Sequence, residues 1–104
     1  MTNATIYTVD TIKNAINHIA PNHKVKQVQL FGSYADNTAT EKSDIDLLVE
    51  FGERPLTIWD IAGFKLALCE YLNIDIEDVD IVQLPLSREA TEDLDIKKVV
   101  QMYG

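Results

Sequence analysis

Two aspartates stand one residue apart in an apolar run of the sequence, "SDIDLLVEF". If this run forms a β-strand, Asp44 and Asp46 project from the same face, with their backbones roughly 7 Å apart. Ile45 and Leu47 then point to the opposite face, into a core. Two neighbouring carboxylates repel each other, and partial burial increases the cost. A divalent cation would offset it, and oxygen ligands suit Mg²⁺; a solvated pair on an edge strand is the alternative.

A glycine–serine pair precedes the aspartates, where Gly32 and Ser33 close an apolar stretch that ends at Phe31. A glycine lets a phosphate approach the backbone closely. A serine at the start of a helical turn offers N–H groups and a hydroxyl to an anion. An ordinary turn with a serine cap is the alternative. Together the two features indicate a phosphate cradle beside a metal site, because a metal lets carboxylates accept a triphosphate.

Alternating helices and strands are expected to position these residues. The expected elements are a helix capped by Thr8 or Asp10 and ending near Ala20, a strand over 25–31, one or two helical turns over 34–39, a strand over 44–51, a helix over 56–72, a strand over 79–84 and a last helix from Ser87 towards Tyr103. This order indicates an α/β fold with a short mixed sheet flanked by helices. The length of 104 residues fits one domain, residues 1–104.

The helix expected over 56–72 carries a broad apolar pattern. Trp59, Ala62, Leu66 and Cys69 form one row at helical spacing. We expect Trp59 in the core or at an interface, and Cys69 packed inside.

Net charge and composition argue against some classes of binding partner. The formal net charge is −8 and Cys69 is the single cysteine. An acidic chain is poorly suited to non-specific nucleic-acid binding, which needs a basic surface. No apolar run approaches the ~20 residues of a membrane span, and no signal peptide is visible. We therefore expect a cytoplasmic protein without direct nucleic-acid or membrane partners.

The sequence resembles the DNA polymerase β-like nucleotidyltransferase superfamily. The resemblance rests on Gly32-Ser33, ten intervening residues and then Asp44-Ile45-Asp46-Leu47-Leu48-Val49. More narrowly, the chain is similar to minimal nucleotidyltransferases of the MNT type, the antitoxins that pair with HEPN toxins. The similarity extends over most of the chain, including "VDIV" at 79–82 and "VVQMYG" at 99–104.

The resemblance implies a third carboxylate, Asp80, although Asp78 lies two residues before it and is the alternative. It implies that Asp44, Asp46 and Asp80 bind two Mg²⁺ ions and form the catalytic set, and that Gly32 and Ser33 bind the nucleotide. The implied reaction moves AMP from ATP to a hydroxyl, a tyrosine hydroxyl by analogy, of a HEPN toxin. The toxin would be neutralised in a hetero-oligomer.

Two neighbouring positions depart from the family pattern. Relatives usually continue the glycine–serine turn with an Arg-Gly pair, whereas this chain has Asp36 and Asn37. Asn37 can adopt the left-handed conformation, so we expect the turn to be kept. Asp36 reverses a charge and supports an alternative function, a non-enzymatic antitoxin that acts by binding alone. A small-molecule nucleotidyltransferase is the other alternative.

Overall fold

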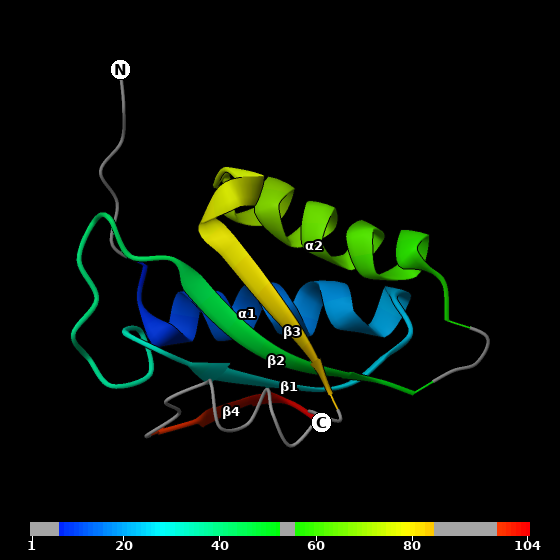
Figure 1. Cartoon of the computed structure of the whole chain (residues 1–104), viewed down its shortest axis with the longest axis horizontal. Helices are drawn as coiled ribbons and strands as arrows, with labels where there is room; N and C mark the ends of the chain where they lie inside the picture. Colours follow the sequence, from blue (N-terminus) through cyan, green and yellow to red (C-terminus); the bar gives the residue numbers. More distant parts are fainter. Residues whose placement is uncertain (1–6, 53–55, 85–97) are drawn as a thin grey trace.

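The computed structural model describes residues 7–52, 56–84 and 98–104 (Figure 1). The elements in chain order are α1 (Val9–Ile19), the short 3-10 helix η1 (Ala20–Asn22), β1 (Val25–Phe31), β2 (Ile45–Phe51), α2 (Ile58–Leu72), the short 3-10 helix η2 (Ile76–Asp78), β3 (Val79–Leu84) and β4 (Val100–Tyr103). The strands form one four-stranded sheet in the order β3-β2-β1-β4.

The sheet is mixed, as expected. β1 pairs antiparallel with both β2 and β4, whereas β2 and β3 are parallel. Parallel neighbours need a long crossover, and α2 provides it. Helices α1 and α2 contact each other, with α1 against β4 and α2 against β3 (Figure 1). The small α/β fold predicted from the sequence is therefore confirmed.

The core lies between the two helices and one face of the sheet. Alternation along β2 sends Ile45, Leu47 and Val49 into this core, where they are fully buried together with Ile16 of α1 and Phe64 of α2. Burial of each such side chain stabilises the fold by about 1.5–3 kcal/mol. The same alternation directs the residues between them to the opposite face of the sheet.

Both helices have the ends that their sequences favour. The Thr8 side chain caps α1 and accepts a hydrogen bond of 3.0 Å from the Thr11 amide, so the cap is Thr8 rather than Asp10. Thr57 and Asp60 form a capping box at the start of α2. Asn73 ends α2 in the left-handed conformation, with φ of 56°. In the described part of the chain, neither helix is long and apolar enough to cross a membrane.

Two predicted helical segments are wrong. Residues 34–37 form hydrogen-bonded turns, and the segment to Ala39 contains no helix. The Asp36 carboxylate accepts hydrogen bonds from the amide and hydroxyl of Thr38, and this local bonding competes with a helix. Residues 100–103, expected at the end of a helix, form β4, because alternation buries Met102 and leaves Gln101 exposed. The expected helix start at Ser87 lies outside the described residues.

Candidate active site

The candidate site begins in the turn after β1. The Gly32 carbonyl accepts hydrogen bonds from the amides of Ala35 and Asp36, at 3.0 and 3.1 Å, and the Ser33 carbonyl accepts one of 2.9 Å from Thr38. Gly32 has φ of 75°, in the region that favours glycine. Within the described residues, the amides of Ser33 and Tyr34 have no hydrogen-bond partner. The turn therefore presents two backbone donors that the fold itself does not use.

Strand pairing brings this turn against Asp46. Phe31, the last residue of β1, pairs with Asp46 in β2. A Cβ added at Gly32 would overlap the Asp46 Oδ2 atom and would lie 3.2 Å from its Cγ atom. The glycine backbone and the Asp46 carboxylate are thus in direct contact, and a side chain at position 32 would displace the carboxylate.

The three aspartates singled out in the sequence lie at the end of the sheet where the parallel strands β2 and β3 begin. We call this group the carboxylate edge (Asp44, Asp46 and Asp80). Asp46 pairs directly with Asp80 across the parallel strands β2 and β3. The pKa of Asp46 is raised to about 6, firstly by burial and secondly by the nearby charges of Asp80 and Asp44. Asp46 is half-buried, whereas Asp44 and Asp80 are exposed.

Asp78 occupies a different environment from Asp80. It lies in η2, before the strand begins, where its amide donates a hydrogen bond of 2.9 Å to the Asp75 carbonyl. Its charge contributes to the raised pKa values of Tyr7 and Cys69. The register of β3 therefore favours Asp80 as the third carboxylate of the edge.

The carboxylate edge is not neutralised by nearby cations. In residues 7–52, 56–84 and 98–104, the ion pairs join Lys24 to Asp60 and Lys26 to Glu50, and neither involves the edge. In the same residues, no three His, Cys, Asp or Glu side chains are close enough to form a metal-ligand cluster. The three carboxylates therefore share an edge and influence one another without forming a closed ligand set.

Residues around the turn complete the local structure. Asn37 is left-handed, with φ of 66°, as the sequence predicts. Tyr34 is buried, and its hydroxyl accepts a hydrogen bond of 3.4 Å from the Tyr7 amide. Tyr34 therefore packs in the core. Asp36 is exposed at the turn, and Thr38 engages its carboxylate.

Comparison with known proteins identifies the fold. The family model of the polymerase beta nucleotidyltransferase domain matches residues 13–99. The chain belongs to this family. A protein from Methanocaldococcus jannaschii, named provisionally as the protein adenylyltransferase MJ0435, is 42% identical over 69 residues, which are 66% of this chain and 73% of that protein.

Solved structures of nucleotidyltransferases agree with this assignment. A provisionally assigned minimal nucleotidyltransferase has a TM-score of 0.70 and 32% identity, with 92% of this chain and 97% of that one covered. A chain in the crystal structure of a toxin–antitoxin with AMP-PNP has a TM-score of 0.67 and 26% identity, with 88% and 73% covered. These likenesses confirm the similarity to minimal nucleotidyltransferases and to toxin–antitoxin proteins that the sequence indicated.

Two features of this nucleotidyltransferase domain were not anticipated from its sequence. The contact between Gly32 and Asp46 follows from the pairing of Phe31 with Asp46, and an antiparallel alignment of the two predicted strands is the signal for it. The hydrogen bonds from Thr38 to Asp36 were also missed, and the Asp-x-Thr spacing is their signal.

Proposed function

We propose that this nucleotidyltransferase transfers AMP from ATP to a hydroxyl of a HEPN-type toxin, with release of pyrophosphate, and thereby neutralises the toxin. The observation that carries the proposal is the contact between Gly32 and Asp46, because it places a phosphate-binding type of turn directly against the carboxylate edge. The relative named as a protein adenylyltransferase supports AMP as the transferred group and a protein as the acceptor. The toxin–antitoxin structure with AMP-PNP supports ATP as the donor.

The turn after β1 is the proposed binding site for the triphosphate. Gly32 has no side chain to obstruct a phosphate, and the amides of Ser33 and Tyr34 are free to donate hydrogen bonds. The Ser33 hydroxyl is a further donor close to the same position. Such fixed donors accelerate phosphoryl transfer by positioning the substrate and by stabilising charge that develops in the transition state.

The carboxylate edge fits divalent cations by the chemistry of its donors. Its donors are all carboxylate oxygens, the ligands that Mg²⁺ prefers, and their mutual repulsion favours a bound cation. Asp44, Asp46 and Asp80 would hold two Mg²⁺ ions, which would neutralise the triphosphate and lower the pKa of the acceptor hydroxyl.

The acceptor is proposed to be a second protein. The described residues build one sheet, two α-helices and two short 3-10 helices, and a hollow among them at the end of α2 is not lined by Asp44, Asp46 or Asp80. The partner would therefore supply the surface that presents the hydroxyl, as in a hetero-oligomer of antitoxin and toxin. Its identity as a HEPN toxin follows from the resemblance of the sequence to MNT-type antitoxins.

Transfer of labelled AMP tests the proposal. The chain is incubated with α-labelled ATP, Mg²⁺ and the HEPN-type toxin encoded with it, and the label on the toxin is followed by gel and mass spectrometry. We expect labelling that requires Mg²⁺ and that is lost with EDTA. Unlabelled toxin in the presence of a tight complex would contradict AMP transfer.

Neutralisation separates catalysis from binding alone. If transfer silences the toxin, Asp44→Asn abolishes neutralisation even at stoichiometric levels. Full neutralisation by Asp44→Asn would instead support the non-enzymatic antitoxin.

A further inference from the structure

The outer side of α2 exposes large apolar side chains. Ile58, Trp59, Ala62 and Leu66 form a strip along the helix, which we call the outer row, and 73%, 80% and 49% of Ile58, Trp59 and Leu66 are exposed. The opposite side of the same helix packs into the core through Phe64 and Leu68, which are fully buried. The helix therefore has two apolar sides, and the fold uses one of them.

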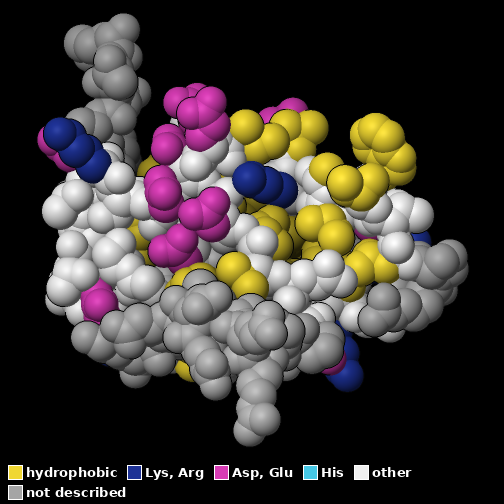
Figure 2. Space-filling model, viewed as in Figure 1, with side chains coloured by type: hydrophobic (Ala, Val, Ile, Leu, Met, Phe, Trp, Pro, Cys, Tyr) yellow, Lys and Arg dark blue, Asp and Glu magenta, His cyan; other side chains and the backbone are white. Residues whose placement is uncertain are grey.

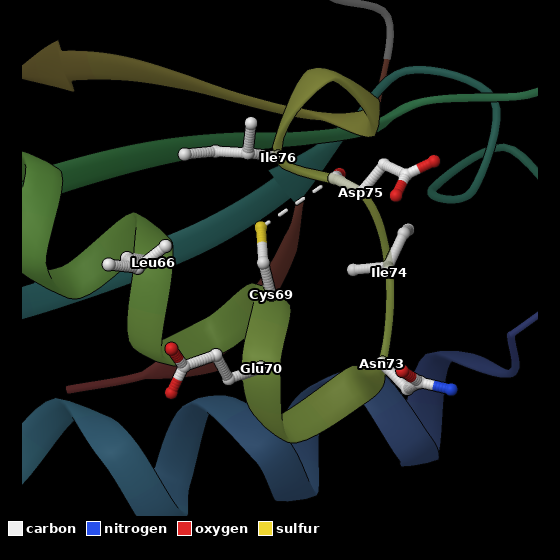
Figure 3. A pocket seen from close by; sticks show the side chains of 7 residues that line it. All are labelled: Leu66, Cys69, Glu70, Asn73, Ile74, Asp75 and Ile76. Atoms are coloured by element: carbon white, nitrogen blue, oxygen red, sulfur yellow. Dashed lines mark hydrogen bonds between the residues drawn. The ribbon is translucent and has the colours of Figure 1, made fainter.

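A hollow of about 270 Å³ continues the outer row at the end of the helix (Figure 3). Its apolar lining comes from Leu66, Cys69, Ile74 and Ile76, and the Cys69 thiol points towards the carbonyl of Asp75 (Figure 3). Leu66 belongs to both the row and the hollow. A hollow of this size is small for a drug-sized ligand but large enough for an apolar side chain of another protein.

Acidic residues lie at one end of this apolar surface. Glu70 and Asp75 line the hollow, and Glu77 is exposed in the adjoining η2. In Figure 2, hydrophobic side chains over α2 lie beside acidic side chains that gather over η2 and the beginnings of β2 and β3. Ile76 precedes Asp80 by four residues, so at most about 14 Å of chain joins the hollow to the carboxylate edge.

We propose that the outer row and the hollow form the docking surface for the acceptor protein, which would insert an apolar side chain into the hollow and place basic residues against its acidic rim. This inference rests on the proposed function, because it seats the acceptor next to the carboxylates that would act on its hydroxyl. An exposed tryptophan, such as Trp59 in the outer row, is typical of the residues that dominate binding at protein interfaces.

Charge favours this acceptor over a second copy of the chain. The chain carries a net charge of −8. A two-fold pairing through the outer row would join two chains that each carry this net charge. Like charges across an interface oppose association, whereas basic residues on a partner complement the acidic rim of the hollow and speed its association.

Calorimetry with the HEPN-type toxin encoded with this chain tests the surface. We expect Trp59→Ser and Leu66→Ser each to weaken toxin binding at least about 30-fold, with unchanged circular dichroism and unchanged ATP binding. Val99→Ser is the matched control, because Val99 is 42% exposed and lies next to β4, the outer strand opposite β3. This variant should change toxin affinity less than about threefold. Glu70→Lys should slow association, most strongly at low salt.

The outcomes distinguish this surface from the proposed reaction. Toxin affinity that is unchanged in both Trp59→Ser and Leu66→Ser overturns the docking surface, even if AMP transfer occurs. Sedimentation that shows a dimer of the wild-type chain, lost in Trp59→Ser, also overturns it, because a second copy then covers the row. Binding that depends on Trp59 without any transfer overturns the proposed reaction and leaves the docking surface standing.

Discussion

The carboxylate edge and the outer row of α2 both cost the isolated chain free energy, but for different physical reasons. At the edge, Asp46 is half-buried beside Asp44 and Asp80, so like charges are held close together. In the outer row, Trp59 exposes 80% of its surface to water. Burial of such a side chain is favourable by about 3 kcal/mol, and neither salt screening nor pH within the ordinary range removes this apolar contribution.

The two regions are built by different parts of the structure. The edge depends on strand register, because Asp46 must pair with Asp80 and lie beside Gly32. The row depends only on the helical repeat of α2, which places Trp59 and Leu66 on one side. Changes in the backbone should therefore disturb the edge more than the row.

The largest effect is expected for Asp46→Asn. Loss of this carboxylate should lower the rate of AMP transfer by about 1,000-fold or more. The reason is that Asp46 would hold the cations that stabilise the charge of the transition state. Asp78→Asn is the control, because Asp78 lies in η2 outside the edge. Initial rates of toxin labelling provide the measurement, and comparable losses in both variants would contradict the assignment of the edge.

A smaller but still large effect is expected for Gly32→Ala. The added Cβ would overlap Asp46 Oδ2, and φ of 75° strains any residue with a side chain. We expect transfer to fall about 100-fold and the free energy of unfolding to fall by about 1–3 kcal/mol. Urea denaturation and labelling rates are the measurements.

Gly63→Ala is the glycine control for this variant. Its Cβ would lie 3.9 Å from the nearest atoms, in His23, so there is room for it within α2. This variant should raise the free energy of unfolding by up to about 1 kcal/mol, because alanine favours the helix. Equal destabilisation by both substitutions would argue against a special role for position 32.

The pH dependence of stability should isolate the repulsion at the edge. The Asp46 pKa is raised from 3.8 to about 6 in the folded chain, so the folded state binds more protons than the unfolded state between these values. In EDTA, the stability that the protonated Asp46 contributes to the folded state is fully present below pH 4 and is lost as pH rises through about 6. With allowance for solvent screening, the loss is on the order of 1 kcal/mol.

The difference in stability between wild type and Asp46→Asn measures this contribution. Urea denaturation of both proteins from pH 4 to 8, in EDTA, should show the variant becoming relatively more stable as pH rises. Parallel curves would show that Asp46 is not held under repulsion.

The smallest effect is expected for Asp36→Arg. Removal of an exposed negative charge near the turn should tighten ATP binding by less than about tenfold, with a larger gain at low salt. Asp36→Asn is the matched control, because asparagine can still accept the hydrogen bonds from Thr38. Affinities measured by calorimetry should increase in the order Asp, Asn, Arg, and equal affinities at low salt would exclude an electrostatic role for this position.

Local patterns in the sequence predicted much of the scaffold. The strand over 25–31 has the predicted bounds, and β2 and β3 were located to within one residue, because alternating or continuous apolar runs between turn residues specify them. Asp44, expected in the same strand as Asp46, lies just before β2, and its charge still contributes to the raised pKa of Asp46 after burial and Asp80. The approach of Asp80 to Asp46 depends on pairing between distant strands, and family resemblance indicated it where local spacing could not.

Sequence patterns were least informative where tertiary structure decides the outcome. The apolar pattern of α2 predicted Trp59 at the core or at an interface, and its exposure excludes the core. The apolar pattern of a helix predicts which of its sides are apolar. It does not show which of two apolar sides the sheet will cover. Residues 100–103 were expected in a helix, whereas pairing with β1 and burial of Met102 make them a strand.

The position of β4 has a consequence for folding during synthesis. β1 is made early, but one of its two edges pairs with a strand far along the chain: Gln29 and Gln101, whose side chains are hydrogen-bonded across the pair, are 72 positions apart. The Asn17 side chain of α1 donates a hydrogen bond of 2.8 Å to the Met102 carbonyl, which adds a second link of long sequence separation. Contacts of this kind form slowly, and an unpaired strand edge can associate with other chains in the meantime. A nascent chain that lacks residues 100–103 therefore leaves β1 with a bare edge, and the sheet closes only after this strand has left the ribosome.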